Sequence, residues 1–290
     1  MSSPASMSRS SVLPKAAMNL FAGLIALASL FPLFWMFLCG FKSAADVMAV
    51  PFQFFPPSYH PENYTNLLLG QVDATIFPQG ASFIRSMILT FLISAGSVVI
   101  SLLLNSMAGY VFARLKFPFK DFLWVLYLIP WFIPPISLLI TQYLVVSQLK
   151  MLNSVWVIIL PGITYTYSIF FYRQFYLGIP QSLEEAAKID GASAGSTYFR
   201  IFLPMSSTPF VIMGMTVFLG YWSSFLWPIL TISDPGLFQI NQLVSYFKTT
   251  YNKQFHYMMA ASAITAVPTI VLFLIFQRRI IQGIKISGIK

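Results

Sequence analysis

The feature that most constrains this chain is a set of six long windows that contain no Asp, Glu, Lys or Arg. Each window holds at least 22 residues, and a helix needs about 20 apolar residues to cross the hydrocarbon core of a bilayer. The six windows are Ala16–Phe41, Ser86–Ala113, Phe122–Leu149, Met151–Tyr172, Ile201–Ser233 and Gln254–Gln277. We therefore predict an all-α polytopic membrane protein with six transmembrane helices.

The composition excludes a soluble globular protein. Hydrophobic residues make up 57% of the chain and charged residues only 9%, whereas soluble domains carry about 25% charged residues. The net charge of +9 could suggest nucleic acid, but orientation in a membrane explains it better. We expect membrane lipid as a partner and no nucleic acid.

The distribution of Lys and Arg predicts that both termini lie in the cytoplasm, because short cytoplasmic loops are enriched in these residues. With this orientation only five of the 17 basic residues fall outside, namely Lys42, Arg85, Lys150, Lys248 and Lys253. The chain is therefore expected to be a multi-pass membrane protein. Residues 1–15 and 278–290 are predicted cytoplasmic tails, and 16–277 a six-span transmembrane domain with an outer loop at 42–82 and a cytoplasmic segment at 173–204.

Four prolines lie inside the predicted spans: Pro130, Pro134, Pro135 and Pro161. Ordinary kinks are favoured here, because neighbouring helices can satisfy the carbonyls that a proline releases. The alternative is that these prolines break the spans and line a cavity.

The stretch SLEEAAKIDGASAGSTYFRIFLP, residues 182–204, is unusually polar for this chain. Ser182 and Glu185 have capping-box spacing, and Gly191 can supply a left-handed helix stop. The pattern predicts a short helix over about 183–190. Such a helix is marginal alone in water, so it is expected to dock on a partner.

The docking surface follows from helical spacing. Leu183, Ala186, Ala187 and Asp190 share one face by the i, i+3, i+4, i+7 rule. Glu184, Glu185 and Asp190 offer carboxylates that suit Arg or Lys on the partner.

This stretch resembles the EAA loop of permease subunits of ABC importers. Matching positions of the motif are Glu185, Ala186, Ala187, Gly191, Phe199 and Pro204, preceded by Ile179–Pro180. The turn RLKFPFK and the ending FQRRIIQGIKISGIK are similar to the carbohydrate-uptake branch, whose usual Gly-Ala-Val-Lys-Gly-type ending this chain lacks. The resemblance covers the second span to the C-terminus. It implies the type I permease fold and a location in the bacterial inner membrane.

The resemblance also implies a mechanism. The segment 173–204 would hold a coupling helix in a groove of a separate ATPase, which Glu185 would contact through an Arg. Two ATP-binding cassette subunits would bind ATP and Mg, a second permease subunit would complete the pore, and an extracytoplasmic binding protein would deliver a sugar or oligosaccharide. A polar solute such as glycerol phosphate is the alternative cargo.

Sugars bind through aromatic stacking and neutral hydrogen bonds. Candidate residues of the solute pathway are therefore aromatic or small and polar, and they occur in three spans. They are Tyr221, Trp222, Ser224, Phe225, Trp227, Asn105, Tyr165 and Tyr167. Each of them could equally pack between helices, as most aromatics in such a chain do.

The sequence lacks the residues that other classes of function require. An ion-coupled secondary transporter would want buried charges in its spans, and the six windows hold none. No GxxxxGK[ST] sequence occurs, so no phosphate-binding loop for ATP is present. An enzyme would want converging titratable groups, whereas His60 and His256 are isolated in the sequence. We expect no cofactor in this chain.

Overall fold

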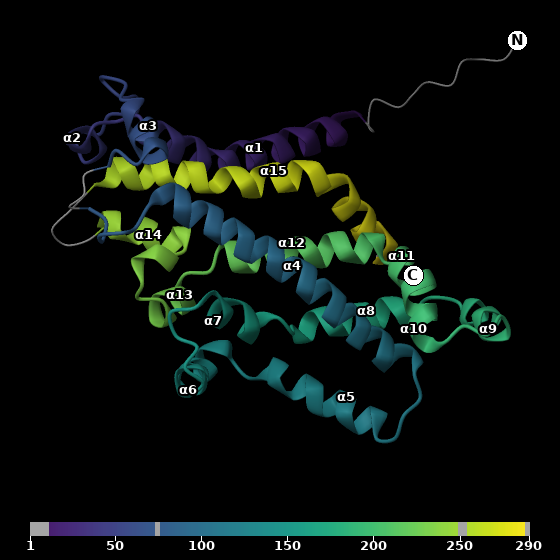
Figure 1. The fold of residues 1–290 in the computed structure, drawn as a ribbon. Helices are drawn as coiled ribbons and strands as arrows, with labels where there is room; N and C mark the ends of the chain where they lie inside the picture. Colours follow the sequence, from purple (N-terminus) through teal and green to yellow (C-terminus); the bar gives the residue numbers. More distant parts are fainter. Residues whose placement is uncertain (1–11, 73–75, 249–253, 288–290) are drawn as a thin grey trace, which may run out of the picture. The chain divides into compact units, whose positions relative to one another are not determined.

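The computed structural model of the 290-residue chain describes residues 12–72, 76–248 and 254–287, with side chains for 15–72, 76–248 and 254–279. Within these ranges every regular element is a helix and no strand occurs, as predicted (Figure 1). The α-helices are α1 (Val12–Cys39), α2 (Ala44–Val47), α3 (Glu62–Leu69), α4 (Phe83–Arg114), α5 (Lys120–Leu128), α6 (Pro135–Gln148), α7 (Val155–Ile159), α8 (Thr166–Leu177), α9 (Gln181–Ile189), α10 (Ala194–Thr197), α11 (Leu203–Met205), α12 (Ser207–Trp222), α13 (Leu226–Thr231), α14 (Ile240–Ser245) and α15 (Phe255–Ser287).

Three helices, α1, α4 and α15, are each long and apolar enough to cross a membrane. The other candidate spans are bent pairs, so the described residues hold three spans, or six if each pair counts as one. The bends are 104° between α5 and α6, 44° between α7 and α8, and 79° between the α10–α11 stretch and α12. The window Ile201–Ser233 is thus not one helix, because its chain bends at Ser206 and α12 ends at Trp222.

The chain forms two compact units. The first contains α1, α2, α3 and the part of α15 up to Ile264. Here the Lys42 ammonium is buried, lies 4.5 Å from the centre of the Trp35 ring and donates to the Gln53 carbonyl at 2.5 Å. These contacts fix the start of the loop at 42–82 against the end of α1.

The second unit contains α4 to α14 and α15 from Thr265 onward. Its centre is α4, which packs against both α8 and α12 (Figure 1). One face of α4 is a buried stripe of small polar side chains, which permit close approach of neighbouring helices. The stripe consists of Ser86, Thr90, Ser94, Ser97, Ser101 and Asn105.

Two hydroxyl groups of this stripe donate to carbonyl groups one turn earlier in α4. Thr90 donates to the Ser86 carbonyl at 2.6 Å and Ser94 donates to the Thr90 carbonyl at 2.7 Å. Further along α4, Gly109 lies so close to α8 that an added Cβ would stand 2.6 Å from Cβ of Tyr172. This tight contact holds α8, and with it the segment 173–204, at a fixed position on α4.

The predicted tails lie partly outside the described residues, which begin at 12 and end at 287. Helix α1 begins at Val12, inside the predicted N-terminal tail, and α15 continues ten residues beyond the predicted end of its span at Gln277. The domain boundaries at 15 and 277 stay predictions.

Candidate functional site

The start of α9 differs from the sequence prediction. The helix begins at Gln181 after Pro180, whose backbone is extended at φ −56° and ψ 134°, and no side chain caps it. The predicted capping box between Ser182 and Glu185 is therefore wrong. An N-cap residue must have non-helical backbone angles, and Ser182 already lies in the first turn of α9.

The end of α9 confirms the predicted stop at Gly191, which has φ +76°. The Ala192 N–H donates to the Ala187 carbonyl at 2.9 Å, and the Gly191 N–H donates to the Lys188 carbonyl at 3.0 Å. These two bonds form a Schellman motif, in which a left-handed residue satisfies the last carbonyls of a helix. The chain leaves α9 in one defined direction toward α10.

The faces of α9 also divide differently from the prediction. Ala187 and Glu184 are 8% and 6% exposed and point toward the rest of the unit. The exposed face includes Ile189, of which 87% is accessible. It also carries Leu183, Glu185, Ala186 and Asp190. Ala187 is therefore not part of the available docking face, because the helix uses it to pack inward.

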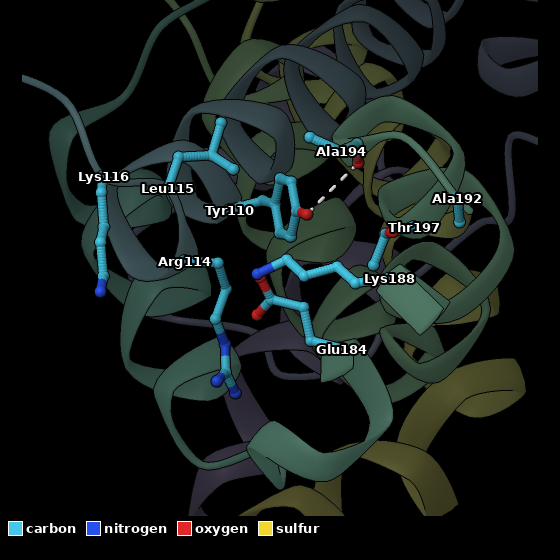
Figure 2. A pocket seen from close by; sticks show the side chains of 9 residues that line it. All are labelled: Tyr110, Arg114, Leu115, Lys116, Glu184, Lys188, Ala192, Ala194 and Thr197. Atoms are coloured by element: carbon cyan, nitrogen blue, oxygen red, sulfur yellow. Dashed lines mark hydrogen bonds and ion pairs between the residues drawn. The ribbon is translucent and has the colours of Figure 1, made fainter. Parts of the chain in front are cut away.

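A pocket of about 270 Å³, here called the coupling pocket, lies between α9 and the end of α4 (Figure 2). The Lys188 ammonium lies 2.9 Å from the Glu184 carboxylate, one turn earlier on α9, and both side chains line the pocket. This ion pair gives the buried carboxylate a counter-charge. The pocket is lined by Tyr110, Arg114, Leu115, Lys116, Glu184, Lys188, Ala192, Ala194 and Thr197.

Arg114, the last residue of α4, ties the coupling pocket to three parts of the segment 173–204. Its guanidinium donates to the Tyr176 carbonyl at 2.5 Å and to the Ile179 carbonyl, and it lies 5.3 Å from the centre of the Phe202 ring. The Tyr176 carbonyl belongs to the last turn of α8, and the Ile179 carbonyl belongs to the link between α8 and α9. Sequence reasoning missed this role; the only available signal was an Arg at the end of a span just before the RLKFPFK turn.

An aromatic cluster continues this connection into the unit. Tyr172, Tyr176 and Phe202 are fully buried, and Tyr110 packs on the Phe202 ring with centroids 4.8 Å apart. The hydroxyl groups of Tyr198 and Ser106 are 2.7 Å apart, which joins the stretch after α10 to α4. The segment that carries α9 is thus held by packing and by hydrogen bonds.

A second cavity, of about 610 Å³, lies where the spans break, and we call it the break cavity. Pro135 and Pro161 both line it, so the expectation of ordinary kinks is wrong for these two prolines. Proline removes a helical hydrogen bond and clashes with the preceding turn. Here the chain makes 3₁₀ turns at 129–132 and 160–162, and the resulting bends leave the cavity open.

Four of the eight candidate pathway residues line the break cavity. They are Tyr165, Tyr221, Ser224 and Trp227. The Tyr221 hydroxyl donates to the Ile159 carbonyl at 2.8 Å, and Trp227 Nε1 donates to the Val157 carbonyl at 2.8 Å. Gln142 and Thr216, which the sequence did not single out, add neutral polar groups.

The other four candidates lie elsewhere. Trp222 is buried and donates from Nε1 to the Thr265 carbonyl at 3.1 Å. Asn105 is buried on α4 and donates to Ser101 Oγ at 2.7 Å. Tyr167 packs against Trp131 and Phe171, and Phe225 is 44% exposed without lining the cavity. The positions of Trp222, Asn105 and Tyr167 reflect helix packing, the alternative that the composition left open.

The described residues contain no group of three or more His, Cys, Asp or Glu side chains that could hold a metal ion. His60 lies 2.6 Å from Glu62, and a backbone hydrogen bond together with this His60 contact lowers the pKa of the Glu62 carboxyl. The pair belongs to the loop at 42–82, where the other ring nitrogen of His60 lies 2.9 Å from the Ser58 hydroxyl.

Three relatives resemble nearly the whole chain. The arabinooligosaccharides transport system permease protein AraQ of Halalkalibacterium halodurans is 30% identical over 92% of this chain and 93% of its own length. The probable ABC transporter permease protein YurM of Bacillus subtilis is 32% identical over 93% of this chain and 86% of its own length. The sn-glycerol-3-phosphate transport system permease protein UgpE of Escherichia coli is 28% identical over 88% of this chain and 90% of its own length.

A solved structure shares the fold. One chain in the crystal structure of a bacterial ABC transporter involved in the import of the acidic polysaccharide alginate superimposes with a TM-score of 0.78 at 17% identity, covering 95% of this chain and 99% of that one. Residues 105–286 also match the family described as binding-protein-dependent transport system inner membrane component. The matched region contains α9, the coupling pocket and the break cavity, and the chain belongs to this family of ABC importer permeases.

Proposed function

We propose that this chain passes a neutral sugar or oligosaccharide through the break cavity. The observation that supports the proposal most strongly is the chemistry of the cavity wall. Aromatic rings of Tyr165, Tyr221 and Trp227 stand beside the neutral polar groups of Gln142, Thr216 and Ser224. Polar groups that line a cavity in the membrane are typical of solute pathways.

The alternative cargo is a glycerol phosphate, which the name of the UgpE relative suggests. A phosphate binds best to Arg or to Lys, which supply charged donors. The described residues that line the break cavity include no charged side chain. The cavity therefore favours the neutral carbohydrate, in line with the name of the AraQ relative.

The proposal extends to coupling. Helix α9 would dock in a groove of a separate ATPase through its exposed face, with Glu185 contacting an Arg there and Gly191 setting the turn. Two such subunits would bind ATP and Mg, a second permease subunit would complete the pore, and an extracytoplasmic binding protein would deliver the solute. Both termini would lie in the cytoplasm. The absence of a GxxxxGK[ST] sequence supports this division.

Uptake of labelled sugar by cells that express the complete transporter tests the pathway. Tyr165→Ala removes a ring from the cavity wall, and we expect it to raise KM for uptake about tenfold, the effect of losing a stacking contact of about 1.4 kcal/mol. Phe225→Ala is the control, because Phe225 is similarly exposed but does not line the cavity. Equal KM values for the two variants would refute the sugar pathway.

Coupling is tested separately with the same cells. Gly191→Pro is incompatible with φ +76°, and Glu185→Lys reverses the charge on the exposed face of α9. We expect both variants to reach the membrane at normal abundance and to lose uptake. Ser182→Ala is the control on the same helix, because no bond caps α9 there. Normal uptake by Glu185→Lys and Gly191→Pro would contradict coupling through α9.

A further inference from the structure

A third hollow in the second unit is a groove between α4, α12 and the final part of α15, which we call the α4–α12–α15 groove. Its volume is about 490 Å³. Its residues are Phe91, Ala95, Val98, Leu102, Ser207, Phe210, Val211, Gly214, Met215, Phe218, Leu272, Phe276 and Arg279. The groove is separate from the coupling pocket and the break cavity, because it shares no lining residue with either.

The two ends of the groove differ in chemistry. At one end Phe91 of α4 meets Phe218 of α12, with ring centroids 5.9 Å apart. At the other end lie Ser207, the first residue of α12, and Arg279 on α15. Ser207 follows the segment 173–204 directly, so the charged end of the groove lies on the same side of the unit as α9.

The wall between these ends is apolar, and its narrowest residue is Gly214. A Cβ at Gly214 would stand 3.5 Å from Cδ1 of Leu102 and 3.6 Å from Cγ1 of Val98. These are ordinary contact distances, so glycine is not required for helix packing here. The absence of a side chain at Gly214 leaves room between α4 and α12 for a group that neither helix supplies.

Arg279 supplies a charge for whatever occupies the groove. Its side chain is exposed, and the ion pairs found among the described residues, His60–Glu62 and Lys188–Glu184, do not involve it. An acyl chain matches the apolar wall, and an anionic headgroup matches a guanidinium at its end. Basic residues beside apolar pockets between membrane helices bind anionic lipid headgroups in this way.

We propose that the α4–α12–α15 groove is a binding site for an anionic glycerophospholipid. One acyl chain lies along Leu102, Gly214 and Phe218, and the lipid phosphate contacts Arg279. The lipid belongs to the leaflet on the α9 side. This site is independent of the solute pathway and of the coupling contact.

Native mass spectrometry of the full-length chain in mild detergent tests the site. The probes are phosphatidylglycerol and, as the uncharged comparison, phosphatidylcholine. We expect Arg279→Gln to weaken phosphatidylglycerol binding about fivefold, the worth of one basic residue near an anionic lipid. Arg278→Gln is the matched control, because Arg278 is the exposed neighbour that does not line the groove.

A second pair of variants tests the acyl-chain part of the groove. Gly214→Leu fills the gap beside Leu102 and should reduce binding of both lipids, while Gly214→Ala should bind them normally. Gly96→Leu is the control on α4, since a Cβ at Gly96 meets nothing within 4 Å and Gly96 does not line the groove. Thermal unfolding of each variant identifies any that fails to fold, and Arg279→Gln carries the test if Gly214→Leu does not fold.

Two results would overturn the proposal. One is equal loss of phosphatidylglycerol from Arg278→Gln and Arg279→Gln, which would show diffuse attraction rather than a site. The other is unchanged lipid binding by folded Gly214→Leu together with loss of a co-purifying second permease chain, which would assign the groove to a protein helix instead.

Discussion

The coupling end of the second unit and its break cavity are built on opposite physical principles. At the coupling end, Arg114 and the fully buried rings of Tyr172, Tyr176 and Phe202 pack around the link from α8 to α9, and the coupling pocket leaves about 270 Å³ unfilled. At the break cavity, Pro135 and Pro161 interrupt the helices and leave about 610 Å³ unfilled. In the first region a guanidinium holds the carbonyls of Tyr176 and Ile179, and in the second neutral polar side chains line a space.

For the proposed coupling through α9, the difference predicts which region moves and which transmits movement. Close-packed interiors have low compressibility and pass a displacement on, so α8, the link to α9 and the stretch after α10 should shift as one body. Bent helices with few contacts across a void can change their angles at lower cost. We therefore expect motion imposed at α9 to be absorbed at the breaks around the cavity.

The largest predicted effect is at Arg114. Arg114→Met removes the bonds to the Tyr176 and Ile179 carbonyls and leaves those carbonyls without this donor. Hydrogen bonds to a charged group contribute about 1.5–3 kcal/mol each, so we expect the free energy of unfolding to fall by about 3 kcal/mol. Thermal unfolding of the purified chain in detergent measures the change.

Lys116→Met is the control for Arg114→Met. Lys116 lines the same coupling pocket and is exposed. If both variants unfolded at the same temperature, the coupling end would not depend on the Arg114 contacts, and the contrast with the break cavity would fail.

Two glycines test the difference in packing directly. Gly109→Ala places a Cβ 2.6 Å from Cβ of Tyr172 and 3.0 Å from the Arg173 backbone nitrogen, and such overpacking costs about 2 kcal/mol. Gly162→Ala at the break cavity meets the Tyr221 hydroxyl at 2.8 Å, the far end of a side chain that can swing away. We expect that substitution to cost less than about 1 kcal/mol.

The unfolding temperatures of these two variants, measured side by side, decide whether the coupling end is packed more tightly than the break cavity. The two substitutions are the same chemical change in helical stretches of one unit, so each controls for the other. An equal or larger loss for Gly162→Ala would show that the break cavity is as rigid as the coupling end.

The smallest predicted effects come from two tyrosine hydroxyls. Tyr198→Phe removes the 2.7 Å contact with Ser106 and should lower the free energy of unfolding by about 1 kcal/mol without changing KM. Tyr165→Phe removes a hydroxyl in the break cavity; it should leave unfolding unchanged and raise KM for sugar uptake by about fivefold. Thermal unfolding and uptake assays on both variants measure these effects. A raised KM for Tyr198→Phe together with a lower unfolding temperature for Tyr165→Phe would contradict the comparison.

Local patterns predicted much of the fold and part of the site. Charge-free windows located the apolar spans, and Gly191 marked the end of α9, because both signals depend on nearby residues alone. The sequence prediction placed the start of α9 at Ser182, because both Pro180 and Ser182 are suitable residues at a helix start. In the structure the helix begins directly after Pro180. Arg114 was missed because its carbonyl partners lie 62 and 65 residues away in the sequence.

The sequence by itself determined that the chain is an all-helical membrane protein with a polar segment at 173–204, since the transfer of charge into lipid is costly wherever the chain folds. Only the tertiary structure decided which prolines open a cavity, which of eight candidate residues face it, and that Ala187 points inward. Those outcomes depend on how separate helices meet, and a helix bend or a buried face is settled by the neighbours that fill or leave the space beside it.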